Sequence, residues 1–285
     1  MIEVGKLAGF CGGVTNSVEK TKKVIKEHKN IYCLGELVHN KEVIKELEDK
    51  GLTIIESLDE VKDGSNVIIR AHGVSKDIYG SAKKRNINLI DLTCPKVLKI
   101  HDSVNEYKNK DFFIILIGSK KHPEVIGTIS FCGEKSTIIE DITDIDNALD
   151  IINKNNYKDI VIFAQTTFKE SLFNEITSII KDKLKSKNIV IENTICSATH
   201  LRQEECKKMS KEKDCMIIIG GKNSSNTKKL YEISLENCKN TYLIETVKDL
   251  NLNEINKYKN IGIMAGASTP KSSIDEVIIN LQKSK

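Results

Sequence analysis

Short apolar runs alternate with amphipathic segments along the whole of this 285-residue chain. The runs are rich in Ile, Leu and Val, and they span Ile31–Leu34, Leu52–Ile55, Val67–Ile69, Leu89–Leu92, Phe112–Ile117, Ile160–Ala164, Ile189–Ile191, Met216–Ile219, Tyr242–Ile244 and Ile261–Met264. Strands that are apolar along their whole length are typical of parallel sheets with helices on both faces. The alternation therefore predicts an α/β fold with mainly parallel sheets.

The segments between the runs have the periodicity of helices. Val14, Val18, Thr21 and Ile25 recur at intervals of three and four residues, which is the spacing of one face of an α-helix. A second amphipathic segment ends before Gly51. No Pro-rich or Ser-rich linker separates these segments, so we expect compact domain boundaries.

Ligand-type residues follow the apolar runs, at the point where each predicted strand ends. Seven runs lead into such segments, which read A-H-G, T-C-P, S-K-K-H-P-E-V, Q-T-T, N-T-I-C, G-K-N-S-S-N and A-G-A-S-T. Open α/β sheets bind ligands beyond the carboxyl ends of their strands. The series therefore predicts that several sheets direct their carboxyl ends at a shared site.

Three cysteines divide the chain into comparable lengths. Cys11, Cys94 and Cys196 each lie in a predicted loop beside small or turn-forming residues, and each interval between them holds about three strand–helix pairs. This spacing indicates a structural repeat of three small α/β units around an axis. We predict the units at residues 12–94, 95–193 and 194–285, with residues 1–11 packing near the third.

The remaining cysteines have simpler interpretations. Two lie in predicted strands and three lie on or near predicted helices, where a free thiol is most often simply buried; they are Cys33, Cys132, Cys206, Cys215 and Cys238. The N-terminus M-I-E-V-G-K lacks the layout of a signal peptide, and no apolar run approaches the ~20 residues of a membrane span. We therefore expect a cytoplasmic protein with reduced thiols and no membrane segment.

Three thiols without a fourth partner favour a [4Fe–4S] cluster in which one iron has no protein ligand. Cys94 precedes Pro95, which we expect to open a helix, and a helix N-terminus favours the thiolate that a metal requires. Structural zinc normally takes four protein ligands at C-x₂₋₄-C spacing, which this chain lacks. An open iron is a Lewis acid that can take a substrate oxygen.

Charge and composition restrict the ligands. The net charge is +4 and the lysines are scattered, so the chain offers no basic block for nucleic acid, and it has no Trp for base stacking. Arginine occurs only at Arg70, Arg85 and Arg202, which makes a bidentate arginine clamp on phosphate improbable. An anionic ligand would instead need lysines, histidines, hydroxyls, amides and backbone N–H groups.

Such groups gather at the predicted strand ends. The segment Gly220–Asn226 is not a Walker A loop, but a helix begins in it after a strand, so Ser224, Ser225, Asn226 and free N–H groups can face an anion. Ser268 repeats this arrangement before Pro270, which we expect to open the last helix. Donor imidazoles in three further loops can hold phosphate oxygens, namely His39, His72 and His122.

A candidate proton donor follows one of these histidines. Glu124 comes directly after His122 and Pro123, and burial in a pocket floor would raise its pKa and make it a general acid. The segment Q-T-T at 165–167 can hydrogen-bond a substrate hydroxyl and tune such a carboxyl group. The helical histidines His28, His101 and His200 are left without a role.

These residues together resemble the IspH/LytB family of 4-hydroxy-3-methylbut-2-enyl diphosphate reductases. The matching segments run in order from Gly9 to Pro270 and cover nearly the whole chain; they are G-F-C-G-G-V, V-H-N, A-H-G-V-S, D-L-T-C-P, H-P-E-V-I-G-T, Q-T-T, I-C-S-A-T-H-L-R-Q, G-G-K-N-S-S-N and A-G-A-S-T-P. The chain departs from the common family pattern at Ile126, where an acidic residue is frequent, and in A-T-H-L-R-Q, where A-T-x-N-R-Q is commoner.

The resemblance implies three α/β units in pseudo-threefold arrangement around a [4Fe–4S] cluster held by Cys11, Cys94 and Cys196. It also implies reductive dehydroxylation of the allylic diphosphate to isopentenyl and dimethylallyl diphosphates, the last step of the non-mevalonate isoprenoid pathway. Glu124 would donate a proton, with Thr166 and Thr167 near the substrate hydroxyl. The diphosphate would be held by His39, His72, His122, Ser224, Ser225, Asn226 and Ser268.

The family resemblance implies a flavodoxin- or ferredoxin-type electron donor, because the chain has no visible flavin or nicotinamide motif. Three other functions fit parts of the pattern. They are a quinolinate-synthase-like enzyme with a three-cysteine cluster, a non-enzymatic iron–sulfur sensor, and a zinc hydrolase built on the three loop histidines.

Overall fold

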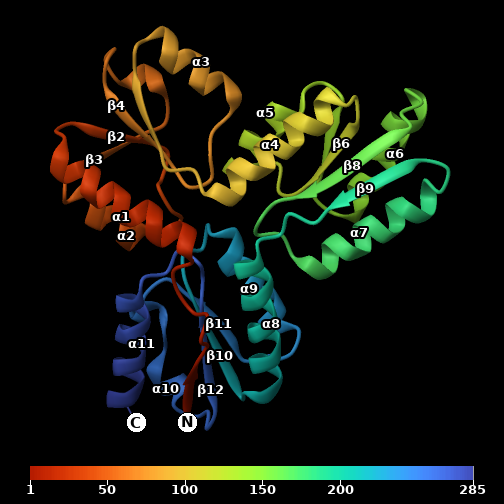
Figure 1. The fold of residues 1–285 in the computed structure, drawn as a ribbon. Helices are drawn as coiled ribbons and strands as arrows, with labels where there is room; N and C mark the ends of the chain where they lie inside the picture. The colour runs from red at the N-terminus through yellow and green to blue at the C-terminus, as the bar shows by residue number, and fades with distance from the viewer. Residues whose placement is uncertain (285) are drawn as a thin grey trace. The chain divides into compact units, whose positions relative to one another are not determined.

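The computed structural model describes residues 1–284, which fold as three four-stranded parallel sheets flanked by helices (Figure 1). The α/β class with parallel sheets is thus confirmed. By internal contacts the chain divides into two compact units. The central unit comprises residues 19–37 and 50–196, and the terminal unit comprises residues 1–18, 38–49 and the chain from 197 onward. The three-unit boundaries expected from the sequence stay a prediction.

The first sheet of the central unit is built from its earlier half. Its strand order is β3 (Leu52–Ile55), β2 (Ile31–Leu34), β4 (Asn66–Ile69) and β5 (Asn88–Asp91), and each neighbouring pair is parallel. Helix α3 (Lys76–Lys84) connects β4 to β5. Val67 and Ile69 of β4 and Leu34 of β2 form a core with Ala82 of this helix, which matches the apolar runs in the sequence.

The second sheet of the central unit has the order β7 (Ser136–Ile139), β6 (Phe113–Ile117), β8 (Asp159–Ala164) and β9 (Asn188–Glu192). Its flanking helices are α4 (Pro95–Asn109), α5 (Pro123–Cys132), α6 (Ile145–Lys154) and α7 (Glu170–Lys183).

Alternation along β6 shows that helices cover both faces of this second sheet. Ile114 and Leu116 pack with α4 and α5, whereas Ile115 and Ile117 pack with α6 and α7. A strand buried on both sides needs apolar residues at every position, and this is why the sequence predicted β6.

The sheet of the terminal unit has the order β1 (Ile2–Val4), β12 (Ile261–Ala265), β10 (Cys215–Ile219) and β11 (Thr241–Ile244). Residues of α8 (Ser197–Glu212) and α9 (Ser225–Leu235) contribute to the core on one face, and residues of α10 (Leu252–Ile255) and α11 (Lys271–Lys283) to the core on the other. The unit also contains α2 (Lys41–Glu48), and α1 (Gly12–Glu27) contributes residues to both units.

All three sheets share one topology. If the strands of each sheet are numbered one to four along the chain, their order across the sheet is two, one, three, four. In the terminal unit the fourth place is taken by β1, from the start of the chain. A short 3₁₀ helix follows the second strand in each case, at Leu58–Glu60, Ile142–Asp144 and Val247–Asp249. The repeat indicated by the cysteine spacing is therefore present in the topology of the sheets.

The structure adds details that the sequence did not predict. The ten expected runs correspond to ten strands within a residue or two, but β1 and β7 were not expected. Pro270 is the N-cap of α11, and the helix itself begins at Lys271, so the expectation that Pro270 opens this helix was wrong by one residue. Within residues 1–284, no helix has both the length and the hydropathy required to cross a membrane.

Candidate functional site

Glu124 and Thr166 form a buried polar pair in the central unit. Glu124 lies in the first turn of α5 and is 3% exposed, and Thr166 lies just after β8. The Thr166 backbone N–H donates to Glu124 Oε1 over 2.6 Å, and the Thr166 hydroxyl is 2.6 Å from Oε2. One residue thus contacts both carboxyl oxygens and fixes the orientation of the group.

This environment brings the pKa of the carboxyl group close to neutral pH. Burial raises the pKa of Glu124 to about 7, and the hydrogen bonds from Thr166 oppose that rise by stabilising the carboxylate. A carboxylic acid with a pKa close to the working pH is suited to general acid catalysis.

His122 caps the helix that carries Glu124. It occupies the N-cap of α5, and its Nδ1 accepts a hydrogen bond of 3.2 Å from the Glu124 backbone N–H. When the ring is neutral, acceptance at Nδ1 places the proton on Nε2. Helix capping therefore fixes the tautomer of the imidazole as well as the position of Glu124.

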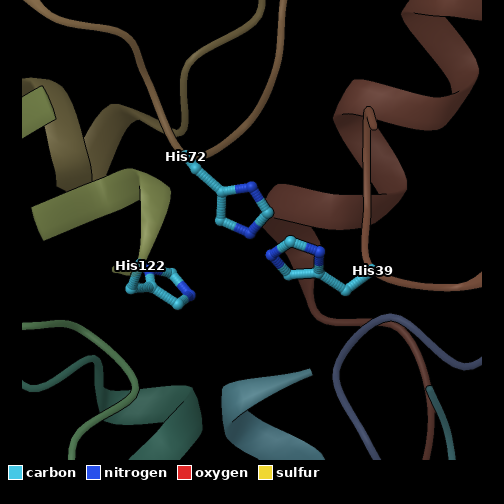
Figure 2. Close-up of side chains that lie close together, drawn as sticks. All are labelled: His39, His72 and His122. Carbon is cyan, nitrogen blue, oxygen red and sulfur yellow. The ribbon is translucent and has the colours of Figure 1, made fainter. Parts of the chain in front are cut away.

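His72 lies close to His122 within the central unit. It belongs to the loop after β4, and the two rings are perpendicular with centroids 5.4 Å apart (Figure 2). The two imidazoles come from loops at the ends of two different sheets, which agrees with the expectation that strand-end loops share a site. Figure 2 also labels His39, which belongs to the loop before α2 of the terminal unit.

A glycine lets the His72 loop approach α4. Gly73 has a φ of +75°, and a Cβ added there would lie 3.1 Å from His101 Cε1. His101 is buried and stacks on Phe131 of α5 at 4.4 Å, and burial lowers its pKa to about 4. A neutral, packed imidazole is a structural support for the His72 loop, which fits the absence of a role for His101 in the sequence interpretation.

Gln165 belongs to the Q-T-T segment that the sequence singled out, and it orients the hydroxyl of Thr167. Its Oε1 accepts from the Ser119 backbone N–H at 3.0 Å, and its Nε2 donates to the Thr167 hydroxyl at 2.7 Å. Gln165 is 2% exposed and both bonds are part-buried, so its amide is held in one orientation. The sequence signal was the polar Q-T-T directly after a fully apolar strand.

In the terminal unit, the segment after β10 presents an unsatisfied buried amide. Ser224 caps α9 by accepting a hydrogen bond of 3.3 Å from the Thr227 backbone N–H. Asn226 is 4% exposed, and within residues 1–284 neither polar atom of its side chain has a hydrogen-bond partner. Because burying an unpaired amide is costly, this geometry points to a polar ligand beside α9.

The His39 loop lies against the same segment. The Ser268 hydroxyl donates to the His39 carbonyl at 3.2 Å, and a Cβ added at Gly221 would lie 2.4 Å from that oxygen. Only a glycine allows this approach. The structure thus brings the backbone of His39 together with Ser268 and the loop before α9.

Three cysteines share one backbone geometry. Cys11, Cys94 and Cys196 are half-buried, and each directly precedes the first residue of a helix. The backbone N–H groups of these cysteines donate to the carbonyls of Ala267, Ala71 and Thr166, respectively. Each carbonyl lies two residues beyond the third strand of its sheet, so the repeated topology places one thiol beside each of three strand ends.

The other five cysteines differ in environment. They are at most 6% exposed, and burial raises the thiol pKa to about 12 at Cys33, Cys132, Cys206 and Cys215. A thiol must lose its proton to bind a metal, so these side chains are poor ligands. A half-buried thiol at the start of a helix keeps the access to solvent that a metal ligand needs.

The amino-acid sequence is similar to those of the LytB family. The LytB protein family matches residues 2–282. The 4-hydroxy-3-methylbut-2-enyl diphosphate reductase of Clostridioides difficile is 44% identical over 282 residues, covering 99% of each chain. The protein of the same name from Aquifex aeolicus is 40% identical over 286 residues, covering 99% of this chain and 96% of its own.

Solved structures agree with the sequence match. The E-1-hydroxy-2-methyl-but-2-enyl-4-diphosphate reductase of Plasmodium falciparum superposes with a TM-score of 0.91 at 33% identity, covering 99% of this chain and 87% of its own. An (E)-4-hydroxy-3-methyl-but-2-enyl diphosphate reductase, described as the terminal enzyme of the non-mevalonate pathway, gives a TM-score of 0.71 at 40% identity, with 99% of both chains covered.

Proposed function

The chain belongs to the LytB family, and from this membership we propose that it reduces (E)-4-hydroxy-3-methylbut-2-enyl diphosphate. The C–O bond to the hydroxyl breaks, two electrons and two protons are consumed, and water leaves. One proton forms the water, and the other adds to the allylic carbon skeleton to give isopentenyl or dimethylallyl diphosphate. The observation that carries the proposal is the family match over residues 2–282. The buried Glu124, whose pKa is about 7, is suited to supply a proton.

We propose that Cys11, Cys94 and Cys196 hold a [4Fe–4S] cluster with one iron free of protein ligands. Their exposure and their position before helices α1, α4 and α8 support this assignment. When bound, such a cluster supplies electrons one at a time and an open Lewis-acid position. A flavodoxin- or ferredoxin-type protein would deliver the electrons in the cytoplasm.

The proposed diphosphate ligands come from the strand-end loops. The imidazole of His122 lies at the start of α5, and the buried amide of Asn226 lies at the start of α9, where the backbone N–H groups of a helix favour an anion. The full proposed set is His39, His72, His122, Ser224, Ser225, Asn226 and Ser268. Binding the diphosphate at a distance from the reacting hydroxyl orients the substrate.

Glu124 is the proposed proton donor to the leaving hydroxyl. Thr166 holds its carboxyl group through both oxygens, and Gln165 directs the hydroxyl of Thr167. A hydroxide ion is a poor leaving group, so protonation at this oxygen lowers the barrier to C–O cleavage. We propose that Thr166 and Thr167 lie beside the substrate hydroxyl.

An anaerobic assay tests the proposal. Protein purified without oxygen should contain about four irons per chain and should convert the allylic diphosphate when a strong one-electron reductant is present. Iron without turnover would favour a sensor, and turnover of quinolinate precursors would favour the quinolinate-synthase-like alternative. Zinc in place of iron would overturn the cluster assignment.

A further inference from the structure

Arg202 is buried on α8 and binds backbone carbonyls at the N-terminus of the chain. It is 3% exposed, its Nε donates to the Leu7 carbonyl at 2.8 Å, and its Nη2 donates to the Gly9 carbonyl at 2.9 Å. A third bond of 3.3 Å joins Nη1 to the carbonyl of Ala198 in the same helix. The guanidinium therefore links α8 to the segment that leads into Cys11.

Glu205 lies three residues further along α8 and satisfies the donors of the same segment. Its Oε1 accepts from the Lys6 backbone N–H at 2.7 Å, and its Oε2 accepts from the Leu7 backbone N–H at 2.9 Å. Arg202 and Glu205 thus bind two carbonyls and two N–H groups of residues 6–9. Hydrogen bonds to charged side chains are stronger than those between neutral groups.

These contacts act on a loop that has no regular secondary structure of its own. Residues 5–10 connect β1 to Cys11, and Gly9 has a φ of +100°. The Cys11 backbone N–H is bound to the carbonyl of Ala267 on the other side of the loop. The path of the chain into Cys11 is consequently defined by α8 and by the end of β12.

We propose that Arg202 and Glu205 are positioning residues for Cys11. They hold residues 6–9 so that the Cys11 thiol is presented to the cluster before the cluster binds. The inference rests on the proposed role of Cys11 as a ligand. Arginine suits this task because its planar fork binds two carbonyls at once, which the single ammonium group of lysine does in a less fixed geometry.

Arg85 provides a matched control in the central unit. Its Nη1 donates to the Leu58 carbonyl at 2.6 Å and its Nη2 to the Val61 carbonyl at 2.5 Å. It therefore also joins two backbone carbonyls of a loop, but that loop contains none of the proposed site residues. Arg85→Gln separates the general loss of an arginine from the loss of support for Cys11.

The first test is amide hydrogen exchange of the cluster-free protein. Arg202→Gln should speed exchange roughly tenfold or more within residues 6–11, whereas Arg202→Lys should have a smaller effect and Arg85→Gln none in that segment. Glu205→Gln weakens the hydrogen bonds to the N–H groups of the same segment. It replaces Arg202→Gln in this test if that variant fails to fold. Wild-type exchange at residues 6–11 in folded Arg202→Gln or Glu205→Gln would overturn the proposal.

The second test is made on the anaerobically reconstituted protein. Arg202→Gln should lose iron to a chelator several-fold faster than the wild type and alter the EPR spectrum of the reduced cluster, and lysine should partly restore both. Iron loss and EPR identical to the wild type would also overturn the proposal. A wild-type protein that binds no iron would instead refute the proposed function, while the exchange result would still report on the loop.

Discussion

The interior of the first sheet and its carboxyl edge give the same residue type opposite properties. Cys33, inside β2, is fully buried, and burial raises its thiol pKa to about 12. Cys94 follows β5 of the same sheet, is half-buried, and directly precedes α4. The interior thus keeps a thiol protonated, whereas the carboxyl edge leaves one partly exposed to solvent.

Burial has a different effect on the pKa of a side chain at the carboxyl edge of a sheet than on one inside the sheet. Glu124 is as buried as many core residues, but it lies at the start of a helix and both its oxygens contact Thr166. Its pKa is therefore raised only to about 7, where it can exchange a proton. Fixed hydrogen-bond donors at strand ends thus allow a buried carboxyl group to titrate near neutral pH.

Replacing the carboxyl group of Glu124 should have the largest effect on turnover. Glu124→Gln keeps the size of the side chain but removes the acidic proton, so turnover should fall on the order of 10²–10⁴-fold. Iron content and much of the affinity for the diphosphate should be retained, because neither depends on this proton. Steady-state kinetics with iron analysis measure both, and turnover within a few-fold of the wild type would contradict the proton-donor role.

The free energy of unfolding should also depend on pH because of Glu124. The pKa of Glu124 is about 7 in the folded protein and 4.5 as a model group, so the folded state holds the proton more tightly. The contribution of Glu124 to the free energy of unfolding is full below pH 4.5. It is lost as pH rises from 4.5 through 7, and the total loss is about 3 kcal/mol at most. Denaturant unfolding should show this loss in the wild type and not in Glu124→Gln. Parallel pH profiles for the two proteins would contradict it.

A smaller change should come from Thr166→Val, which removes the hydroxyl and keeps the shape of the side chain. The hydroxyl bond to Glu124 lowers the carboxyl pKa, so its loss should raise that pKa further. The fall in turnover at alkaline pH should then move to higher pH than in the wild type. An unchanged pH–rate profile would mean that Thr166 does not tune the acid.

Much of the fold could be predicted from the sequence because the sheets are covered on both faces. Strands such as β6 and β8 are apolar at nearly every position, and this produces runs that need no alignment to detect. β7 reads S-T-I-I at a sheet edge, and β1 has three residues and pairs with β12 from the far end of the chain. Neither has a local signal strong enough to identify it.

The site could be predicted in part for a related reason. The rule that ligands lie beyond parallel strands singled out His72, Glu124 and Thr166 before any contact was known. It could not show that Thr166 contacts both carboxyl oxygens, or that Arg202 binds the segment before Cys11. Such bonds join residues far apart in sequence, and no periodicity records them.

Iron analysis of single cysteine variants tests the contrast between edge and interior most directly. Each of the eight cysteines is changed to serine, and iron per folded chain is measured after anaerobic reconstitution. We expect Cys11→Ser, Cys94→Ser and Cys196→Ser to lose most of their iron, and the variants at Cys33, Cys132, Cys206, Cys215 and Cys238 to keep it. Loss of iron from folded Cys33→Ser, or its retention in Cys94→Ser, would contradict the account.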